Sequence, residues 1–372
     1  MIPGFRVTPW EVKGERVDYE RLVHDLRLKR IDFELRSAIR RVLGEEHYLL
    51  ERGVFFAHSS LDSFLEDLSK DHLRPYVFTG RGPSGPIHLG NLVPLMLAKW
   101  LQERLRAPLY LQVSDDEKYC LRPDLSLRKV REWARDNVAE LLALGFDEER
   151  TRVIWDTECS SWLYPASLLI AKRVRVSELK DSTKLDDNSN PGILYYALLQ
   201  SLPALMLPLL ADERYRCVVP MAVDQHPLMI PSLLAARRLG LEEPAVVHSV
   251  FIPGVRGEPK MGTSNPRSAI FLSEPVNSAL MKIDESACPS NDLPPAIHYL
   301  RVLDAEGYES VLSVYLESRD EGCGLAKRRV KELIVPLLEE HSRRKREFLD
   351  KVDEFVLREP PFPWEAIEGF DS

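Results

Sequence analysis

The stretch YVFTGRGPSGPIHLGNLVPLMLAKWLQ, residues 76–102, decides the fold of this 372-residue chain. It opens with a short apolar run, continues through a loop rich in glycine and proline, and ends in a long amphipathic segment. This order predicts a β-strand, a turn and an α-helix. Ligands of open α/β sheets bind beyond the carboxyl ends of the strands, so the loop is a candidate ligand site.

The loop has features that suit an anionic ligand. Its glycines let the backbone approach a bulky group closely, and a helix that starts near Asn91 would direct its free N–H groups at a phosphate. His88, just before that helix, places a ring donor within reach of a phosphate oxygen. The loop matches neither the P-loop nor the dinucleotide-binding pattern, so a tight turn that caps the helix remains the alternative.

Working outward, short β-rich runs alternate with amphipathic segments. The predicted strands are residues 76–79, 109–113, 152–155, 217–223 and 246–251. The predicted helices are residues 92–106, 127–144, 164–174, 193–210 and 228–239. This alternation predicts an α/β fold with a Rossmann-like parallel sheet.

The pattern divides the chain into three parts. Residues 75–275 form the predicted catalytic domain. Residues 276–372 contain few strand candidates and predict a helical domain. Residues 1–74, with helical runs at 30–43 and 60–68, predict an appended N-terminal segment.

Composition limits the classes of protein. No run of eighteen apolar residues exists and the start lacks a signal-peptide pattern, so we expect a cytoplasmic protein without membrane spans. The five cysteines form no CxxC pair, which predicts neither a zinc site nor a disulfide framework. The net charge of -8 argues against a protein coated in nucleic acid. Two basic clusters at 327–331 and 343–346 leave open a local RNA contact or a solvated helix face.

A second loop, FIPGVRGEPKMGTSNPRSAIFLS (residues 251–273), follows the last predicted strand. Lys260 lies in a glycine- and hydroxyl-bearing stretch that suits a mobile anion clamp, since a cation near a triphosphate neutralises charge as a phosphoryl bond breaks. A surface hairpin with an exposed lysine is the alternative.

Together the two loops carry a family resemblance. PIHLGN resembles the HIGH motif of class I aminoacyl-tRNA synthetases, and KMGTS resembles their KMSKS loop. FTGRGPSGPIHLG, LQVSDDEKY, VDQHP and SNPRSAIFL are similar to tryptophanyl-tRNA synthetases of the archaeal and eukaryotic type. The resemblance runs from about residue 5 to 275 and continues weakly beyond.

The resemblance implies two reactions: activation of tryptophan with ATP, and transfer of tryptophan from the adenylate to the 3′ end of tRNA(Trp). It gives catalytic roles to His88, Asn91 and Lys260. The residues it assigns to ATP are Arg81, Gly82, Pro83, Gly85, His88, Gly90, Asn91, Lys260, Met261 and Ser264. Mg²⁺ would accompany ATP through the phosphates, so no protein-held metal is expected.

For tryptophan, the resemblance assigns a second set of residues. These are Phe78, Gln112, Glu117, Gln200, Met221, Asp224 and Gln225. Glu117 would accept the indole N–H, which is the one donor of that ring. Without the resemblance, the acidic stretch around Glu117 would be an N-terminal helix cap.

Three positions depart from the family pattern: Phe78 replaces a common tyrosine, Asn91 replaces the last histidine of HIGH, and Gly262 replaces a serine. They keep two alternatives open, a tyrosyl-type ligase and a paralogue that binds nucleotide or RNA without charging tRNA. The resemblance further implies that the helical C-terminal domain reads the anticodon and that the chain forms homodimers. Neither DNA nor a membrane is an expected partner.

Overall fold

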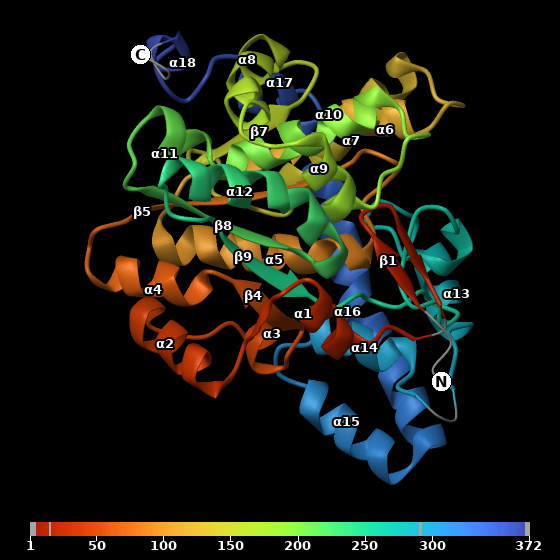
Figure 1. Ribbon diagram of the computed structural model, residues 1–372. Helices are drawn as coiled ribbons and strands as arrows, with labels where there is room; N and C mark the ends of the chain where they lie inside the picture. The colour runs from red at the N-terminus through yellow and green to blue at the C-terminus, as the bar shows by residue number, and fades with distance from the viewer. Residues whose placement is uncertain (1–4, 15, 290–291, 369–372) are drawn as a thin grey trace.

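The computed structural model describes residues 5–14, 16–289 and 292–368. The outer ends of the first and third predicted domains, residues 1–4 and 369–372, lie outside this range. A seven-stranded sheet runs through the middle of the molecule, in the order β3-β4-β9-β8-β5-β6-β7 (Figure 1). Its strands are β3 (Lys29–Arg30), β4 (Phe55–Ser59), β5 (Arg74–Arg81), β6 (Leu109–Val113), β7 (Thr151–Trp155), β8 (Tyr215–Ala222) and β9 (Ala245–Ser249).

The predicted Rossmann-like α/β fold is confirmed, with one addition. Strands β9, β8, β5, β6 and β7 pair in parallel, as expected from the helices between them. Strand β4 pairs with β9 and β3 pairs with β4, both antiparallel, so the sheet is mixed and mostly parallel. The N-terminal segment therefore extends the sheet. Strand β4 escaped prediction because its first four residues are all buried and show no polar alternation.

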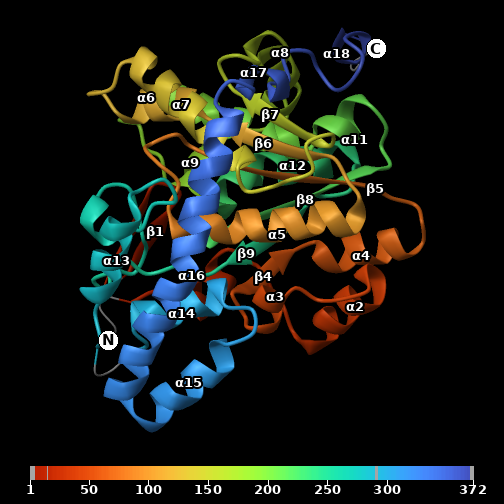
Figure 2. The same cartoon turned by 180° about the vertical axis from the view of Figure 1, so that it is seen from behind.

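Helices cover both faces of the sheet. Figure 2 shows α5 and α16 on one face, and Figure 1 shows α10 and α12 on the other. Up to the end of the predicted catalytic domain, the helices are α1 (Tyr19–Asp25), α2 (Phe33–Leu43), α3 (Tyr48–Glu51), α4 (Leu61–Ser69), α5 (Leu89–Leu105), α6 (Asp115–Leu121), α7 (Leu127–Leu142), α8 (Ser160–Ala171), α9 (Val176–Thr183), α10 (Pro191–Ser201), α11 (Met206–Leu210) and α12 (Ile230–Leu239).

One predicted helix is interrupted. The sequence pattern predicts a single helix over residues 193–210, but α10 ends at Ser201, a 3₁₀ turn follows over Leu202–Ala204, and α11 begins at Met206. Pro203 lies inside the turn and lacks an N–H, which ends the regular helical ladder there.

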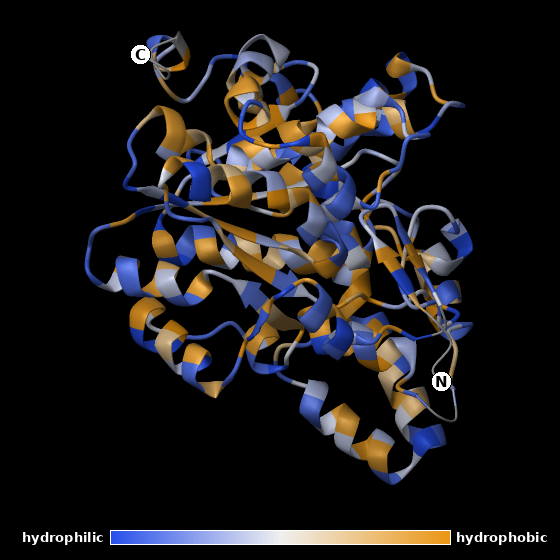
Figure 3. Ribbon diagram, in the orientation of Figure 1, coloured by the Kyte–Doolittle hydropathy of each residue, from blue (hydrophilic) through white to orange (hydrophobic). Residues whose placement is uncertain are grey.

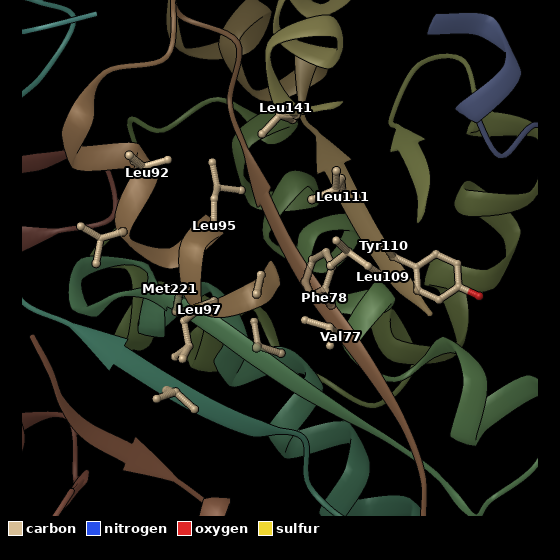
Figure 4. Packing of buried hydrophobic residues seen from close by; sticks show 14 of the residues in the cluster. Val77, Phe78, Leu92, Leu95, Leu97, Leu109, Tyr110, Leu111, Leu141 and Met221 are labelled. Carbon is tan, nitrogen blue, oxygen red and sulfur yellow. The ribbon is translucent and has the colours of Figure 1, made fainter. Parts of the chain in front are cut away.

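The main core lies between the sheet and its helices. Apolar residues concentrate on the strands and on the helix sides that face them (Figure 3). Figure 4 shows side chains of this cluster from α5, such as Leu95, and from the strands, such as Val77 of β5 and Leu111 of β6. These side chains are almost fully buried. Burial of aliphatic side chains at about 1.5–3 kcal/mol each fixes α5, and with it the loop that precedes α5, onto the sheet.

The C-terminal part is helical, as predicted. Its helices are α13 (Val276–Asp284), α14 (Pro295–Leu303), α15 (Tyr308–Glu317), α16 (Arg319–Phe348), α17 (Val352–Phe355) and α18 (Glu365–Glu368). Helix α16 runs back along the catalytic part, where Lys345 pairs with Asp136 of α7 at 2.7 Å. Helix α16 thus connects the two parts, because it packs against α13, α14 and α15 and also against α7.

The two predicted basic clusters are largely engaged within the chain. Lys327 donates to the carbonyl oxygens of Asp284 and Ser286, and Arg329 pairs with Asp304 at 2.6 Å. In the second cluster Arg343 pairs with glutamates of its own helix. Arg328 and Arg346 are exposed. Most of these side chains therefore fit the alternative of a helix face without RNA. An RNA contact would use the exposed side chains.

The expectation that no cysteine is paired is wrong for Cys288 and Cys323, which form a disulfide. Their Cα atoms are 6.5 Å apart, within the range of such bonds. The pair could not be foreseen because 35 residues separate the two cysteines and only the packing of α13 on α16 brings them together. Within the described ranges, no helix combines the length and apolar character needed to cross a membrane.

Candidate active site

The loop between β5 and α5 is held by a half-buried arginine. Arg81 donates to the side-chain oxygens of Asn91 and Asn137, the latter at 2.5 Å, and to the carbonyl oxygen of Gly85 at 2.7 Å. Asn137 of α7 also donates to the Gly85 carbonyl, at 3.0 Å. Burial lowers the pKa of Arg81 to about 10, which leaves the guanidinium charged at neutral pH. The loop is therefore fixed in shape without any ligand.

Glu140 of α7 binds the same loop through its backbone. Its carboxylate accepts the backbone N–H of Ile87 at 2.8 Å, together with the hydroxyl of Ser273, and Lys345 lies 3.5 Å away. Burial raises the pKa of Glu140, and Lys345 opposes that rise. Ser273 is the last residue of the second predicted loop, so one carboxylate connects the two loops and α16 to α7.

The two loops also pair through their backbones. The N–H of Leu89 donates to Ile270 at 3.0 Å, and the N–H of Leu272 donates to Ile87 at 2.8 Å. Nearer the tips, the hydroxyls of Ser84 and Thr263 lie 3.2 Å apart. The sequence reasoning placed both loops at ATP, and the structure brings them side by side at the carboxyl ends of β5 and β9.

His88 precedes α5 and lies beside Gly90. The Asn91 side chain accepts the His88 backbone N–H at 3.2 Å, which caps the helix. The His88 ring is buried, and its Nδ1 has no hydrogen-bond partner among the described residues. Burial lowers the pKa of His88 well below its ordinary value, and Arg81 and Lys260 add to this effect, so the ring is neutral. A buried, unpaired ring nitrogen at a helix N-terminus fits a phosphate-bearing ligand.

Lys260 is paired with the protein itself. Its ammonium forms an ion pair with Asp224 and lies 5.1 Å from the centre of the Phe251 ring. Asp224 is fully buried in its side chain, while about a third of the Lys260 side chain is exposed. The other Asp224 oxygen, Oδ1, is buried without a partner among the described residues. An arriving polyphosphate would therefore compete with one buried carboxylate for Lys260.

Three of the residues predicted to bind tryptophan lie on one face of the sheet. Phe78 pairs with Tyr110 and Gly80 with Gln112 across β5 and β6, and paired residues of parallel strands point to the same side. Tyr76 pairs with Cys217 on β8, which places Met221 on that side too because strand residues alternate. Gly80 is needed here, because a Cβ would lie 2.7 Å from the Gln112 carbonyl oxygen. The apolar Phe78 and Met221 and the amide of Gln112 thus lie on one common surface.

A chain of polar groups borders that surface. Glu117 of α6 accepts from Ser114 at 3.2 Å and from Lys118 at 2.9 Å. The hydroxyl of Tyr196 lies 3.4 Å from that of Ser114 and donates to the side-chain oxygen of Gln200. Glu117 and Gln200, which lie on α6 and α10, are therefore linked through two residues that the sequence reasoning did not identify.

An acidic pair lies beside Gln112. The Gln112 amide donates to Asp156 at 2.9 Å. Burial raises the pKa of Asp116 to about 6, and burial together with the charge of Asp116 raises the pKa of Asp156. The two carboxyl groups share the site in the manner of a pair that gives up only one proton easily. Asp116 lies in the predicted SDDEK stretch, whereas nothing in the sequence pointed to Asp156.

The remaining predicted residues are placed as follows. A Cβ on Gly82 would lie against the ends of the Glu117 and Lys118 side chains, so glycine lets the loop pass close to both of them. Pro83 and Gly85 are buried in the same loop. Met261 is buried against Gly90, and Ser264 is exposed, so these two members of the KMGTS loop face opposite ways.

Some residues that shape the site were missed. Asn137 and Glu140 are polar residues on the buried side of α7, three apart, and that departure from an apolar stripe was the available signal. Pro9 and Trp10 come from the N-terminal hairpin: the Pro9 carbonyl accepts from Gln225 at 2.9 Å, and the Trp10 indole donates to Glu117 at 3.2 Å. Nothing local in the sequence relates residue 10 to residue 117. Within the described part of the chain, no group of three or more histidine, cysteine or acidic side chains could hold a metal ion.

With this geometry established, comparisons with known proteins give the class. The family model described as tRNA synthetases class I (W and Y) matches residues 70–340. The tryptophan–tRNA ligase of Saccharolobus solfataricus is 39% identical over 280 residues, covering 75% of this chain and 72% of that protein. The one from Pyrobaculum aerophilum is 33% identical over 369 residues, covering 95% and 97%. The crystal structure of Plasmodium falciparum tryptophanyl-tRNA synthetase matches with a TM-score of 0.79 and 28% identity, covering 96% of this chain and 97% of that one.

The chain belongs to the class I tRNA synthetases of the tryptophan and tyrosine family. The predicted resemblance to tryptophanyl-tRNA synthetases and the predicted enzyme class, an ATP-using aminoacyl-tRNA synthetase, are confirmed. The predicted reaction, tryptophan–tRNA ligation, agrees with the names of these relatives.

Proposed function

We propose that this chain activates L-tryptophan with ATP and transfers it to the 3′ end of tRNA(Trp). The observation that supports the proposal most is the meeting of two loops beside one group of amide and carboxylate side chains. The loop of residues 81–91 and the loop around Lys260 adjoin, and the side chains of Gln112, Glu117, Gln200 and Gln225 lie in the hydrogen-bonded groups next to them. The proposed nucleotide site and the proposed amino-acid site would thus be neighbours with different chemistries.

On the nucleotide side, ATP would lie against the N-terminus of α5. Gly82 and Gly90 keep the loop free of side chains, and the free N–H groups of the helix and the His88 ring would donate to phosphate oxygens. Lys260 would leave Asp224 and neutralise charge on the departing pyrophosphate. Mg²⁺ would be held through the phosphates of ATP.

On the amino-acid side, the indole would lie over the surface that carries Phe78 and Met221, with its N–H directed to Glu117. Gln200 and Gln225 would take the polar end of the substrate, and Gln112 would help to orient it. A buried carboxylate that loses its donor is costly, so phenylalanine, which has no ring N–H, would bind less well. Phe78, lacking a hydroxyl, leaves this discrimination to Glu117.

The chemistry would proceed in two displacement steps. A carboxylate oxygen of tryptophan attacks the α-phosphorus of ATP, the bond to the bridging oxygen breaks, and pyrophosphate leaves. A ribose hydroxyl of the tRNA then attacks the carbonyl carbon of the adenylate, and AMP leaves. Most of the acceleration would come from positioning and charge stabilisation by residues that the fold already fixes, such as Arg81 and His88.

We further propose that the C-terminal helices contact the tRNA and that the chain works as a homodimer in the cytoplasm. The first point would use exposed side chains such as Arg328 and Arg346, because their neighbours are engaged within the chain. Size-exclusion chromatography with light scattering would test the dimer, and a monomer at micromolar concentration would refute it.

The reaction is tested by exchange of labelled pyrophosphate into ATP, with tryptophan, tyrosine and phenylalanine supplied separately. Exchange with tryptophan alone is the expected result. Exchange with tyrosine would instead identify a tyrosyl-type ligase. A folded protein that binds ATP but exchanges with none of the three would be the non-charging paralogue.

The role of Glu117 is tested by Glu117→Gln, which keeps the size of the side chain but weakens it as an acceptor. Tryptophan binding should weaken by about 1–3 kcal/mol, the scale of a compromised buried hydrogen bond. Glu132→Gln, on the exposed side of α7, is the matched control and should bind like the parent. If the parent, Glu117→Gln and Glu132→Gln bind tryptophan with equal affinity, Glu117 does not contact the substrate.

A further inference from the structure

A small hairpin lies outside the main sheet. Strands β1 (Arg6–Thr8) and β2 (Glu11–Lys13) pair with each other alone, and Pro9 and Trp10 form the turn between them. The hydroxyl of Thr8 closes the turn by accepting the N–H of Glu11 at 3.1 Å. Figure 1 shows the hairpin in red, standing apart from the seven-stranded sheet.

The turn is bound to the candidate amino-acid site at two points. The indole N–H of Trp10 donates to Glu117 Oε1 at 3.2 Å. The Gln225 side chain donates to the carbonyl oxygen of Pro9 at 2.9 Å. Both partners belong to the set that the proposed function gives to tryptophan, although 107 and 216 residues separate them from the turn.

The contact at Glu117 is chemically specific. A substrate tryptophan carries the same group as Trp10, an indole with one N–H donor. Glu117 already accepts from Ser114, Lys118 and Trp10. Ser114 and Lys118 flank Glu117 in the same short stretch, so Trp10 is the donor that comes from elsewhere in the fold. It is therefore the donor that a substrate indole would displace.

We propose that Trp10 is an internal competitor of the substrate, which holds the hairpin turn over the amino-acid site until tryptophan displaces it. The proposal rests on the proposed function, since it takes Glu117 as a substrate contact. Binding of tryptophan then exchanges one indole N–H at Glu117 for another and frees Gln225 from the Pro9 carbonyl.

Only the turn has to move. The strands of the hairpin are anchored separately, because Val7 and Val12 pack on a small second core of Leu22, Leu28, Phe56 and Phe251. Trp10 is partly exposed, unlike Glu117, and packs against the outside of the main core, so its ring can leave by giving up those outer contacts. The apparent Kd of a site covered in this way is its intrinsic Kd divided by the fraction of molecules in which the site is uncovered.

The first test is tryptophan binding without ATP or tRNA, measured by equilibrium dialysis. Trp10→Phe keeps an aromatic ring and removes the N–H, so it should tighten tryptophan binding by about fivefold, the effect of losing one competing hydrogen bond. Trp364→Phe, at an exposed tryptophan on the C-terminal side, is the matched control and should bind like the parent. Unchanged binding in Trp10→Phe would overturn the proposal, and weaker binding would show that Trp10 builds the pocket instead of competing for it.

These outcomes separate the proposal from the proposed function. If Glu117→Gln weakens tryptophan binding while Trp10→Phe leaves it unchanged, the function stands and the internal competitor is refuted. If the parent protein binds no tryptophan at all, the proposed function fails, and the competitor fails with it.

A second readout needs no affinity. Protein labelled with 5-fluorotryptophan gives a ¹⁹F resonance for Trp10. The resonance is assigned because it is missing from the spectrum of Trp10→Phe. Glu117→Gln should shift this resonance in the ligand-free protein, which tests the contact itself. Saturating tryptophan should shift it as well and leave the Trp364 resonance in place. A Trp10 resonance that tryptophan does not move would overturn the proposal.

Discussion

The two loops that meet at the candidate ATP site are held in opposite ways. Residues 81–91 are fixed by the half-buried Arg81 and by the buried Asn137 and Glu140, which together bind the loop's carbonyls, an amide and a side chain. The loop around Lys260 is exposed over much of its length, and its lysine is held by Asp224 and by the face of Phe251. The first loop is preorganised for a ligand. In the second loop, Lys260 can leave Asp224 and bind a ligand instead. Substitutions should therefore affect stability in one loop and rate in the other.

The largest expected effect is on the fixed loop. Glu140→Leu removes the acceptor for Ile87 and Ser273 and leaves Lys345 without this partner, so the free energy of unfolding should fall by about 3–5 kcal/mol. Chemical denaturation monitored by circular dichroism measures it. Glu132→Leu, exposed on the same helix, should change stability by less than about 0.5 kcal/mol. Similar losses in both variants would show that the loop is not anchored through Glu140.

A substitution in the loop around Lys260 should change the rate of adenylate formation. Lys260→Ala should slow adenylate formation about 100-fold, because a cation no longer meets the departing pyrophosphate. Its cost in stability should be about 1–3 kcal/mol, because the buried Asp224 carboxylate loses Lys260, and should stay below that of Glu140→Leu, because about a third of the Lys260 side chain is already exposed. Single-turnover kinetics measure the rate, with Arg256→Ala as an exposed control in the same loop. A variant with normal activation would make the KMGTS loop purely structural.

A third prediction concerns the acidic pair beside the amino-acid site. The folded-state pKa of Asp116 is about 6, above its ordinary value of 3.8, so the folded state favours the protonated acid. The stability from this group is present below pH 3.8 and is lost as the pH rises through about 6. Asp116→Asn should therefore raise stability by about 1–2 kcal/mol at pH 7 and flatten its decline between pH 4 and 6. Unfolding curves over that range check it, and parallel pH profiles for both proteins would contradict it.

The smallest effect belongs to the point where the two loops touch. Thr263→Val removes the hydroxyl contact with Ser84 while keeping the shape of the side chain. The contact is partly exposed, so stability should change by less than about 1 kcal/mol, and the KM for ATP should rise about two- to fivefold. Pyrophosphate exchange at varied ATP concentration measures it. An unchanged KM would mean that the loops act independently of this contact.

The sequence predicted the parallel strands and the helices between them closely. The predicted strand at residues 109–113 coincides with β6, and the strand–loop–helix unit at 76–102 became β5 and α5. These elements are decided by local patterns of apolar residues and turn formers, which a single chain displays directly. Strand β4 and the broken helix at 193–210 were not foreseen, because complete burial hides alternation and an interior proline weakens a helical pattern without showing where it breaks.

The site follows the same division. The family resemblance assigned His88 and Lys260 to ATP and Glu117 to the indole, on the stretches PIHLGN, KMGTS and LQVSDDEKY. The assignment of their individual roles stays a prediction. The supports of the site were not predicted. Asn137 and Glu140 left one signal, as polar residues on the buried side of α7, and Asp156 carries no local signal that distinguishes it from other polar residues.

The sequence by itself thus determined the family, the order of strands and helices, and the two loops that carry the chemistry. Only the tertiary structure decided which buried groups fix the first loop, that Cys288 joins Cys323, and that Trp10 binds Glu117. The reason is physical. Local structure depends on neighbours a few residues apart, whereas these contacts join residues from 35 to more than 100 positions apart and exist only once the core has packed.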